Sequence, residues 1–169
     1  TALDDRIIDR SPMERIKNFP VDLEDPDPFE PDEVERILEA MPSDEIRRMF
    51  EFAFFTGLRT GELLAIAWED VDLDKAKMRI HRNRVKQAWK DPKTKASKRY
   101  IDIQDGALAA LKEQKAATFM RPAIEVPVFR NGKAQIERFR PIWLNPEGRV
   151  WIDSKQLRDR AWEPAMKKA

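Results

Sequence analysis

An arginine and a glutamate lie three residues apart in a largely apolar stretch of the sequence, residues 55–64, which reads FTGLRTGELL. On a helix, side chains at this spacing share a face, so the carboxylate of Glu62 can hold the guanidinium of Arg59 in one orientation. A guanidinium held in this way presents a fork of donors that suits two phosphate oxygens, and a helix N-terminus adds a favourable dipole. From this spacing alone, a structural ion pair between two packed helices is the favoured interpretation, and an anion site is the alternative.

A dense run of basic residues is the second candidate for chemistry. Residues 77–99 contain one acid, Asp91, and ten bases: Lys77, Arg79, Arg82, Arg84, Lys86, Lys90, Lys93, Lys95, Lys98 and Arg99. Such a density favours contact with a polyanion, although a solvated hairpin would also carry it. The net charge of the chain is only +1, since twelve acids fall between residues 21 and 51 against three bases.

Several other kinds of site are excluded or disfavoured by the residues present. The chain has no cysteine, which excludes disulfides, thiol catalysis and thiolate metal sites. Its one histidine, His81, falls in a predicted strand without a serine or aspartate at a useful spacing, so we expect a surface or packing role. Neither of the common glycine-rich nucleotide-binding loops is present. We therefore expect no metal and no other cofactor.

Length and composition indicate one globular domain with a fragment of a second. The 169 residues, 41% of them hydrophobic, are enough to bury a core. No apolar run approaches the ~20 residues of a membrane span, and the N-terminus lacks the layout of a signal peptide. We expect a cytoplasmic protein with no membrane partner.

Three helices are expected around Arg59. Pro31 opens the first, whose apolar stripe consists of Val34, Ile37, Leu38 and Met41. Ser43 is the expected N-cap of the second, which runs through Phe55. A third, short helix extends over residues 60–67 and has Arg59 at its mouth.

Two strands are expected to carry the basic run. Residues 77–89 and 98–103 alternate apolar and polar side chains, and the polar connection between them makes a hairpin. A helix follows over residues 106–120, with the inward side chains Leu108, Leu111 and Ala116 or Ala117.

The remaining chain is less regular. Residues 121–153 are expected to be irregular, with short strands at VPVF and RPIW. Ser154 is the expected cap of a last helix, in which Pro164 requires a bend or a break. These elements predict an α+β fold, a mainly helical domain with a small antiparallel sheet.

Two motifs in this order resemble the tyrosine recombinase family, specifically the phage-type integrases. The first, T-G-x-R-x-x-E-L followed by W-x-D-[IV], corresponds to Thr56, Gly57, Arg59, Glu62, Leu63, Trp68, Asp70 and Val71. The second, P-K-T-x-x-S-x-R, corresponds to Pro92, Lys93, Thr94, Ser97 and Arg99. By this resemblance residues 28–169 are part of an integrase catalytic domain, 20–27 a linker, and 1–19 the end of a helical, SAM-like core-binding domain.

The resemblance also implies a mechanism. In this family a tyrosine hydroxyl attacks a DNA phosphodiester and forms a 3′-phosphotyrosyl link without metal or nucleotide. Arg59 would then bind the scissile phosphate, Glu62 would support it, and Lys93 would protonate the departing 5′-oxygen, with Lys95 as the second choice. Contacts to the DNA backbone would come from Thr94, Lys95, Lys98 and Arg99.

The resemblance is incomplete. In the family an H-x-x-R motif, another histidine or tryptophan, and the nucleophilic tyrosine follow the lysine turn, and we identify none of the three downstream of it here. The one tyrosine, Tyr100, lies in the hairpin and is expected to pack or to lie at the surface, so this chain holds no nucleophile. We expect a truncated catalytic domain, either an expressed fragment or a shortened gene, that cleaves no DNA alone.

The expected partner is double-stranded DNA at attachment sites, with self-association as a tetramer in the full-length recombinase. Such a recombinase integrates or excises mobile or prophage DNA at the nucleoid of a bacterial host. The alternatives are a DNA-binding module without catalysis and a protein-interaction fragment that uses the acidic helix over residues 32–41.

Overall fold

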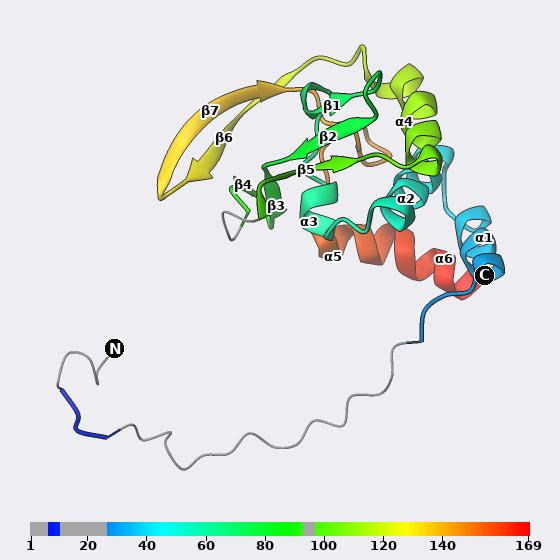
Figure 1. Ribbon diagram of the computed structural model, residues 1–169. Helices are drawn as coiled ribbons and strands as arrows, with labels where there is room; N and C mark the ends of the chain where they lie inside the picture. The colour runs from blue at the N-terminus through cyan, green and yellow to red at the C-terminus, as the bar shows by residue number, and fades with distance from the viewer. Residues whose placement is uncertain (1–6, 11–26, 93–96) are drawn as a thin grey trace.

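The computed structural model describes residues 7–10, 27–92 and 97–169. Most of the expected core-binding remnant over residues 1–19, most of the linker, and residues 93–96 of the lysine turn lie outside these ranges. Within them, the helices gather on one side of the domain, and a long two-stranded ribbon extends from the other side (Figure 1). No helix in the described ranges has both the length and the apolar character needed to cross a membrane.

The helices around Arg59 begin and end at local signals. α1 (Pro31–Glu39) has its proline in the first turn, and α2 (Asp44–Thr56) is capped by Ser43, whose hydroxyl accepts the N–H of Ile46 at 3.3 Å. α2 ends at Gly57, which has the left-handed φ of 58° that glycine adopts most easily. These bounds confirm the sequence expectations for both helices.

α3 (Thr60–Leu63) is shorter than the expected helix over residues 60–67. The helix cannot continue over residues 66–68, because these residues form backbone hydrogen bonds with residues 140–142. Ile66 accepts the N–H of Ile142 at 3.3 Å, and the N–H of Trp68 donates to the carbonyl of Arg140 at 2.9 Å. A short 3₁₀ turn, η1 (Trp68–Asp70), follows.

The strands form two sheets. β1 (Val71–Asp72), β2 (Lys77–Ile80) and β5 (Arg99–Asp102) make an antiparallel sheet in the order β1-β2-β5. β3 (Asn83–Val85), β4 (Ala88–Lys90), β6 (Ile124–Arg130) and β7 (Lys133–Phe139) make the second, in the order β3-β4-β6-β7. β2 pairs with β5 as expected for residues 77–80 and 99–102, but β3 and β4 lie between them in the chain, so the two strands are not joined by a single turn as a hairpin.

The single strand expected over residues 77–89 is wrong, since it divides into β2, β3 and β4. Consecutive side chains at His81 and Arg82 are both buried, which breaks the alternation of a strand as the chain passes between the sheets. Lys86 then takes a positive φ of 52° in the turn between β3 and β4. β7 was not expected at all, and Pro141 in RPIW makes a single bridge with Ala67 instead of a strand.

α4 (Asp105–Thr118) presents a different face from the one expected. Leu111 is buried as predicted, but Ala116 and Ala117 are exposed, and Gln114 and Thr118 lie inside instead. The amide of Gln114 is satisfied there, because it accepts from Arg48 Nε at 2.9 Å and donates to the carbonyl of Ile142 at 3.2 Å. Two polar residues therefore occupy the buried face of this helix.

The last helical segment consists of α5 (Ser154–Leu157), a π turn η3 (Arg158–Trp162) and α6 (Glu163–Lys168). Its N-cap is Asp153 and not Ser154, since the Asp153 carboxylate accepts the N–H of Gln156 at 2.9 Å. In the π turn the N–H of Glu163 bonds the carbonyl of Arg158, five residues back. This wider turn directly precedes Pro164, where the sequence required a bend or a break.

One main core unites these elements. Buried apolar side chains from α1, α2, α4, β2 and the α5–α6 segment form it, with the Phe52 and Trp143 rings 5.5 Å apart near its centre. A smaller cluster of Ala65, Ala67, Trp89, Val128 and Phe139 lies under the β4, β6 and β7 strands. Together the two clusters hold α3 and the sheet β1-β2-β5 in a fixed relation.

Candidate functional site

Arg59, Glu62 and Arg99 meet at the start of α3. Arg59 is the N-cap of this helix, and its own backbone N–H donates to Glu62 Oε2 at 3.3 Å. The Glu62 side chain is only 3% exposed. Arg99 donates to it through both terminal nitrogens, with Nη1–Oε1 at 3.1 Å and Nη2–Oε2 at 3.0 Å. A buried carboxylate is thus enclosed by donors from two elements far apart in sequence.

The guanidinium of Arg59 is open to solvent. Its side chain is 78% exposed, and the Nη1 atom lies 3.5 Å from Glu62 Oε1. Glu62 therefore holds the backbone of Arg59 and lies beside one nitrogen of its guanidinium, most of which remains exposed. The expected contact between Arg59 and Glu62 is present, and the exposed guanidinium is accessible to an anion.

The charge state of Glu62 follows from its neighbours. Burial raises the pKa of this carboxyl, but the hydrogen bond and charge of Arg99, followed by the backbone N–H and charge of Arg59, outweigh burial and hold the pKa below its usual value. Glu62 is therefore ionised at neutral pH and pairs with two cations.

Gly61 brings α3 close to β3. A Cβ at this position would lie 2.9 Å from the carbonyl oxygen of Arg84 and 2.0 Å from the side-chain oxygen of Asn83. Only a glycine lets the backbone of α3 approach β3 to this distance. The position of the helix that carries Arg59 and Glu62 therefore depends on this residue.

The basic turn is described only at its two ends. Lys93, Thr94 and Lys95 lie outside the described residues. On either side of them, the Lys98 ammonium contacts Asp91 Oδ2 at 2.6 Å. Lys98, expected to contact DNA, is thus paired within the chain, although its side chain remains 40% exposed.

Arg99 also has a partner that the sequence did not suggest. Besides Glu62, its Nη1 donates to the carbonyl of Ser97 at 3.0 Å. The expectation for Arg99 was a DNA phosphate, whereas in this structure its terminal nitrogens are directed at Glu62 and at the backbone. Tyr100, the next residue, is 73% exposed on β5, so its expected surface position is confirmed.

A buried charge network lies behind the site and was missed by sequence reasoning. Asp70 accepts from the N–H of Ala67 at 3.0 Å, from His81 Nε2 at 2.7 Å and from the Arg82 guanidinium. Arg82 continues to Glu137 Oε2 at 3.2 Å, and Glu137 binds Arg130. Asp70 stands in the W-x-D part of the first motif, which is the one sequence signal that pointed here.

One member of this network, Arg130, connects it to the basic turn. Arg130 contacts Asp91, which also binds Lys98. The Nη2 atom of Arg130 lies 3.4 Å from His81 Nδ1, so the histidine lies between Arg130 and Asp70. The ribbon β6-β7 is therefore joined through charges to the strand that enters the turn.

The letters H-x-x-R do occur once, at His81 and Arg84, ahead of the lysine turn. Both side chains are buried, and Arg84 donates to the carbonyls of Trp151 at 3.1 Å and Gln87 at 2.8 Å. Its guanidinium also covers the Trp89 ring at 4.6 Å. These contacts give both side chains a structural role within the protein.

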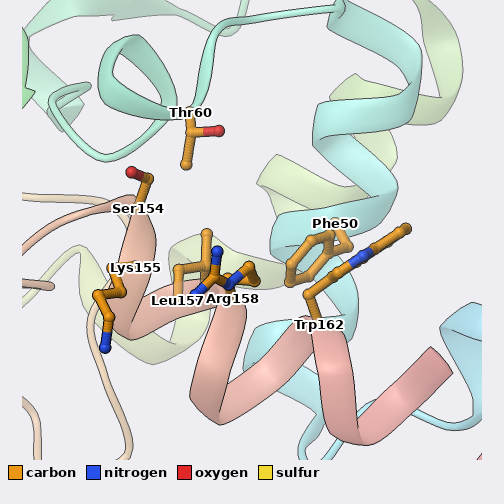
Figure 2. Close-up of a pocket in the computed structure, with 7 residues that line it drawn as sticks. All are labelled: Phe50, Thr60, Ser154, Lys155, Leu157, Arg158 and Trp162. Carbon is orange, nitrogen blue, oxygen red and sulfur yellow. The ribbon is translucent and has the colours of Figure 1, made fainter. Parts of the chain in front are cut away.

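A pocket of about 550 Å³ opens beside the residue that follows Arg59. Figure 2 shows Thr60 and Ser154 at one end of it and the rings of Phe50 and Trp162 at the other. The two rings are stacked with centroids 5.5 Å apart. At the wall formed by α5, Lys155 is paired with Asp159 at 2.9 Å.

Within the described ranges, no three histidine, aspartate or glutamate side chains converge closely enough to hold a metal ion. The chemistry available from the described residues is therefore that of guanidinium and ammonium groups placed by carboxylates. Such groups bind and stabilise oxyanions.

Comparison with known proteins identifies the family of the chain. Residues 28–127 match the phage integrase family. Over 169 residues the chain is 31% identical to the prophage integrase IntR of Escherichia coli, an alignment that covers 96% of this chain and 41% of that protein. Over 126 residues it is 30% identical to the ICEBs1 integrase of Bacillus subtilis, with 69% and 33% covered.

A solved structure extends the likeness to the fold. The integrase of the Tn1549 transposon, in complex with a circular intermediate DNA, superposes with a TM-score of 0.62 at 18% identity, covering 89% of this chain and 48% of that one. The chain spans less than half the length of each of these three relatives. It belongs to the phage integrase family of tyrosine recombinases, and the expected α+β fold of part of their catalytic domain is confirmed.

Proposed function

We propose that this chain forms the Arg59 side of the active site of a site-specific DNA recombinase that acts through a 3′-phosphotyrosyl intermediate. The observation that carries the proposal is the exposed Arg59 guanidinium above the buried, ionised Glu62. An arginine fixed at its base and open at its tip can bind two oxygens of one phosphate.

The roles follow from the charges that the reaction creates. As a tyrosine oxygen attacks phosphorus, negative charge grows on the non-bridging oxygens, and Arg59 would stabilise it. The bond to the 5′-oxygen breaks in the same step, and this oxygen takes a proton from Lys93, or from Lys95 as the second choice. Glu62 would keep Arg59 in place. The proposed DNA-backbone contacts are Thr94, Lys95 and Lys98, whereas Arg99 donates to Glu62.

We infer that the attacking tyrosine is not Tyr100, which lies exposed on β5, the strand that follows the lysine turn. It is also the one tyrosine of the sequence, and no histidine follows His81. We therefore infer that the 169 residues alone bind duplex DNA without cleaving it. In the complete recombinase, assembly as a tetramer on attachment sites is part of the same proposal.

The experiment is a binding titration of the chain with a short fluorescein-labelled DNA duplex, followed by fluorescence anisotropy. We expect weak affinity that falls steeply with salt, because lysine and arginine contacts to phosphate release counterions. The double variant Lys93→Ala/Lys95→Ala should lower affinity and reduce the slope against log salt by about 2.

A matched control removes two lysines elsewhere. Lys167→Ala/Lys168→Ala lies at the end of α6, an element that carries none of the proposed contacts. An equal loss of affinity in the two double variants would show that binding is a diffuse charge effect, and it would refute the turn as the contact.

A further inference from the structure

Arg99 encloses Glu62 more tightly than Arg59 does. Its two terminal nitrogens donate to the two carboxylate oxygens at 3.1 and 3.0 Å, a paired geometry that is among the stronger protein ion contacts. Arg59 approaches the same carboxylate with one nitrogen at 3.5 Å and keeps most of its surface in water. The carboxylate is therefore held by the arginine from β5.

Arg59, Arg99 and Glu62 together carry one positive charge that has no carboxylate to balance it within this group. Two guanidinium groups share a single carboxylate, and the exposed group is Arg59 at 78%, against 34% for Arg99. Without Arg99, the Glu62 carboxylate would have Arg59 as its nearest cation. The two would then neutralise one another, and the fork of Arg59 would be occupied by a carboxylate instead of a phosphate.

We propose that Arg99 is a positioning residue, which occupies both oxygens of Glu62 so that the guanidinium of Arg59 stays free for a phosphate. This inference rests on the proposed function, since it explains how the phosphate-binding arginine keeps its charge beside a buried glutamate. It assigns to Arg99 a role within the protein in place of a direct contact to the DNA backbone.

Arg99 also connects the helix that carries Arg59 to the end of the lysine turn. As the first residue of β5 it pairs with Ile80 of β2, and its guanidinium also holds the carbonyl of Ser97. One side chain thus connects α3, the sheet β1-β2-β5 and the backbone that leads out of the lysine turn. The distance between Arg59 and the end of that turn is set by this contact.

The test compares DNA affinity with and without the Glu62 charge, with the chain and the labelled duplex described above. Arg99→Ala should weaken binding about tenfold, similar to Arg59→Ala, and each should lower the salt slope by about 0.9. Adding Glu62→Gln to Arg99→Ala removes the carboxylate that would capture Arg59. This double variant should recover affinity to within about threefold of the parent chain and restore the salt slope.

Three controls separate the possible outcomes. Glu62→Gln should not rescue Arg59→Ala, and it should not rescue Arg79→Ala, which removes one exposed charge from the neighbouring strand β2. If Glu62→Gln fails to rescue Arg99→Ala, Arg99 contacts phosphate itself and the inference is overturned while the proposed function stands. If Arg59→Ala binds as well as the parent chain, Arg59 is no phosphate ligand and both proposals fail.

Arg99→Ala leaves a buried carboxylate short of partners, so circular dichroism must show that it folds. Should it unfold, Arg99→Lys provides the same test, because lysine keeps a charge beside Glu62 but cannot fill both oxygens. We expect an intermediate loss of about threefold that Glu62→Gln repairs. Affinity equal to the parent in Arg99→Lys would overturn the inference, since a lysine can replace an arginine that merely contacts phosphate.

Discussion

Truncation of Asp70 is expected to be the most damaging change outside the apolar core. The side chain is 5% exposed and holds the N–H of Ala67, His81 Nε2 and the Arg82 guanidinium. Asp70→Ala would leave Arg82, itself 5% exposed, with Glu137 as its remaining carboxylate at 3.2 Å. It would also leave the histidine and the start of η1 without their acceptor.

The magnitude follows from these contacts. Removing one partner of a buried ion pair costs about 3–5 kcal/mol, because the other charge stays in the protein interior. The retained contact to Glu137, and the stacking of Arg82 on Phe139 at 4.1 Å, place the expected loss at the lower end. We expect the free energy of unfolding to fall by about 3 kcal/mol, a large part of the stability of a domain this size.

The assay is urea unfolding at neutral pH followed by tryptophan fluorescence, for which the chain has five tryptophans. Asp72→Ala is the matched control, two residues along the chain. Its carboxylate is partly exposed, pairs with Lys75 at 3.1 Å on the surface and accepts the N–H of Lys75 at 3.0 Å, so the loss should be small beside that of Asp70→Ala. Asp70→Asn should fall between the two, since the amide oxygen can still accept from Ala67.

A loss for Asp70→Ala no greater than that for Asp72→Ala would refute this reasoning. It would mean that the buried charges of Arg82 and Glu137 are solvated in the folded chain, or that they rearrange without cost. A midpoint that shifts together with the slope of the unfolding curve would instead indicate a changed unfolded or folded ensemble.

Two further predictions concern α3. Gly61→Ala should destabilise the fold by about 1–3 kcal/mol in the same urea assay, because the new Cβ meets the backbone of β3; Gly57→Ala, where a Cβ meets nothing within 4 Å, should cost about 1 kcal/mol through its left-handed φ alone. The folded-state pKa of Glu62 lies below the usual 4.5. The ionised carboxylate therefore contributes its full stabilisation of the fold above pH 4.5, and this stabilisation is lost as the pH falls through the folded-state pKa. Stability of Glu62→Gln, measured by thermal unfolding across the acid range, should therefore depend less steeply on pH than stability of the parent chain, and parallel curves would contradict the assignment.

Local signals in the sequence predicted the helices around the site. Pro31, Ser43 and Gly57 each act within a turn of their own position, through a fixed φ, a side-chain cap or a left-handed φ. The Arg59–Glu62 contact was predictable for the same reason, since three residues of helix separate the two side chains. What the sequence indicated correctly was thus set by residues close together along the chain.

Contacts between distant residues were not predictable in this way. The division of residues 77–89 into three strands depends on pairing with β5 and β6, and α3 stops where residue 66 meets residue 142. Counting the bases of residues 77–99 also overlooked contacts between distant residues. It took Arg82, Arg84 and Arg99 as available to a polyanion, whereas all three donate to acceptors inside the protein.

Because of the π turn in the last helix, the burial of the residues after it depends on how many residues the turn contains. Leu157, Ala161 and Ala165 are all buried, at a spacing of four. In an uninterrupted α-helix each step of four advances the side chain by about 40°, so the three side chains would drift by about 80° across the buried face. The wider turn restores the phase. Substitution of the exposed Asp159 should therefore be tolerated, whereas deletion of any one residue of the turn would rotate everything after it away from α1 and α2.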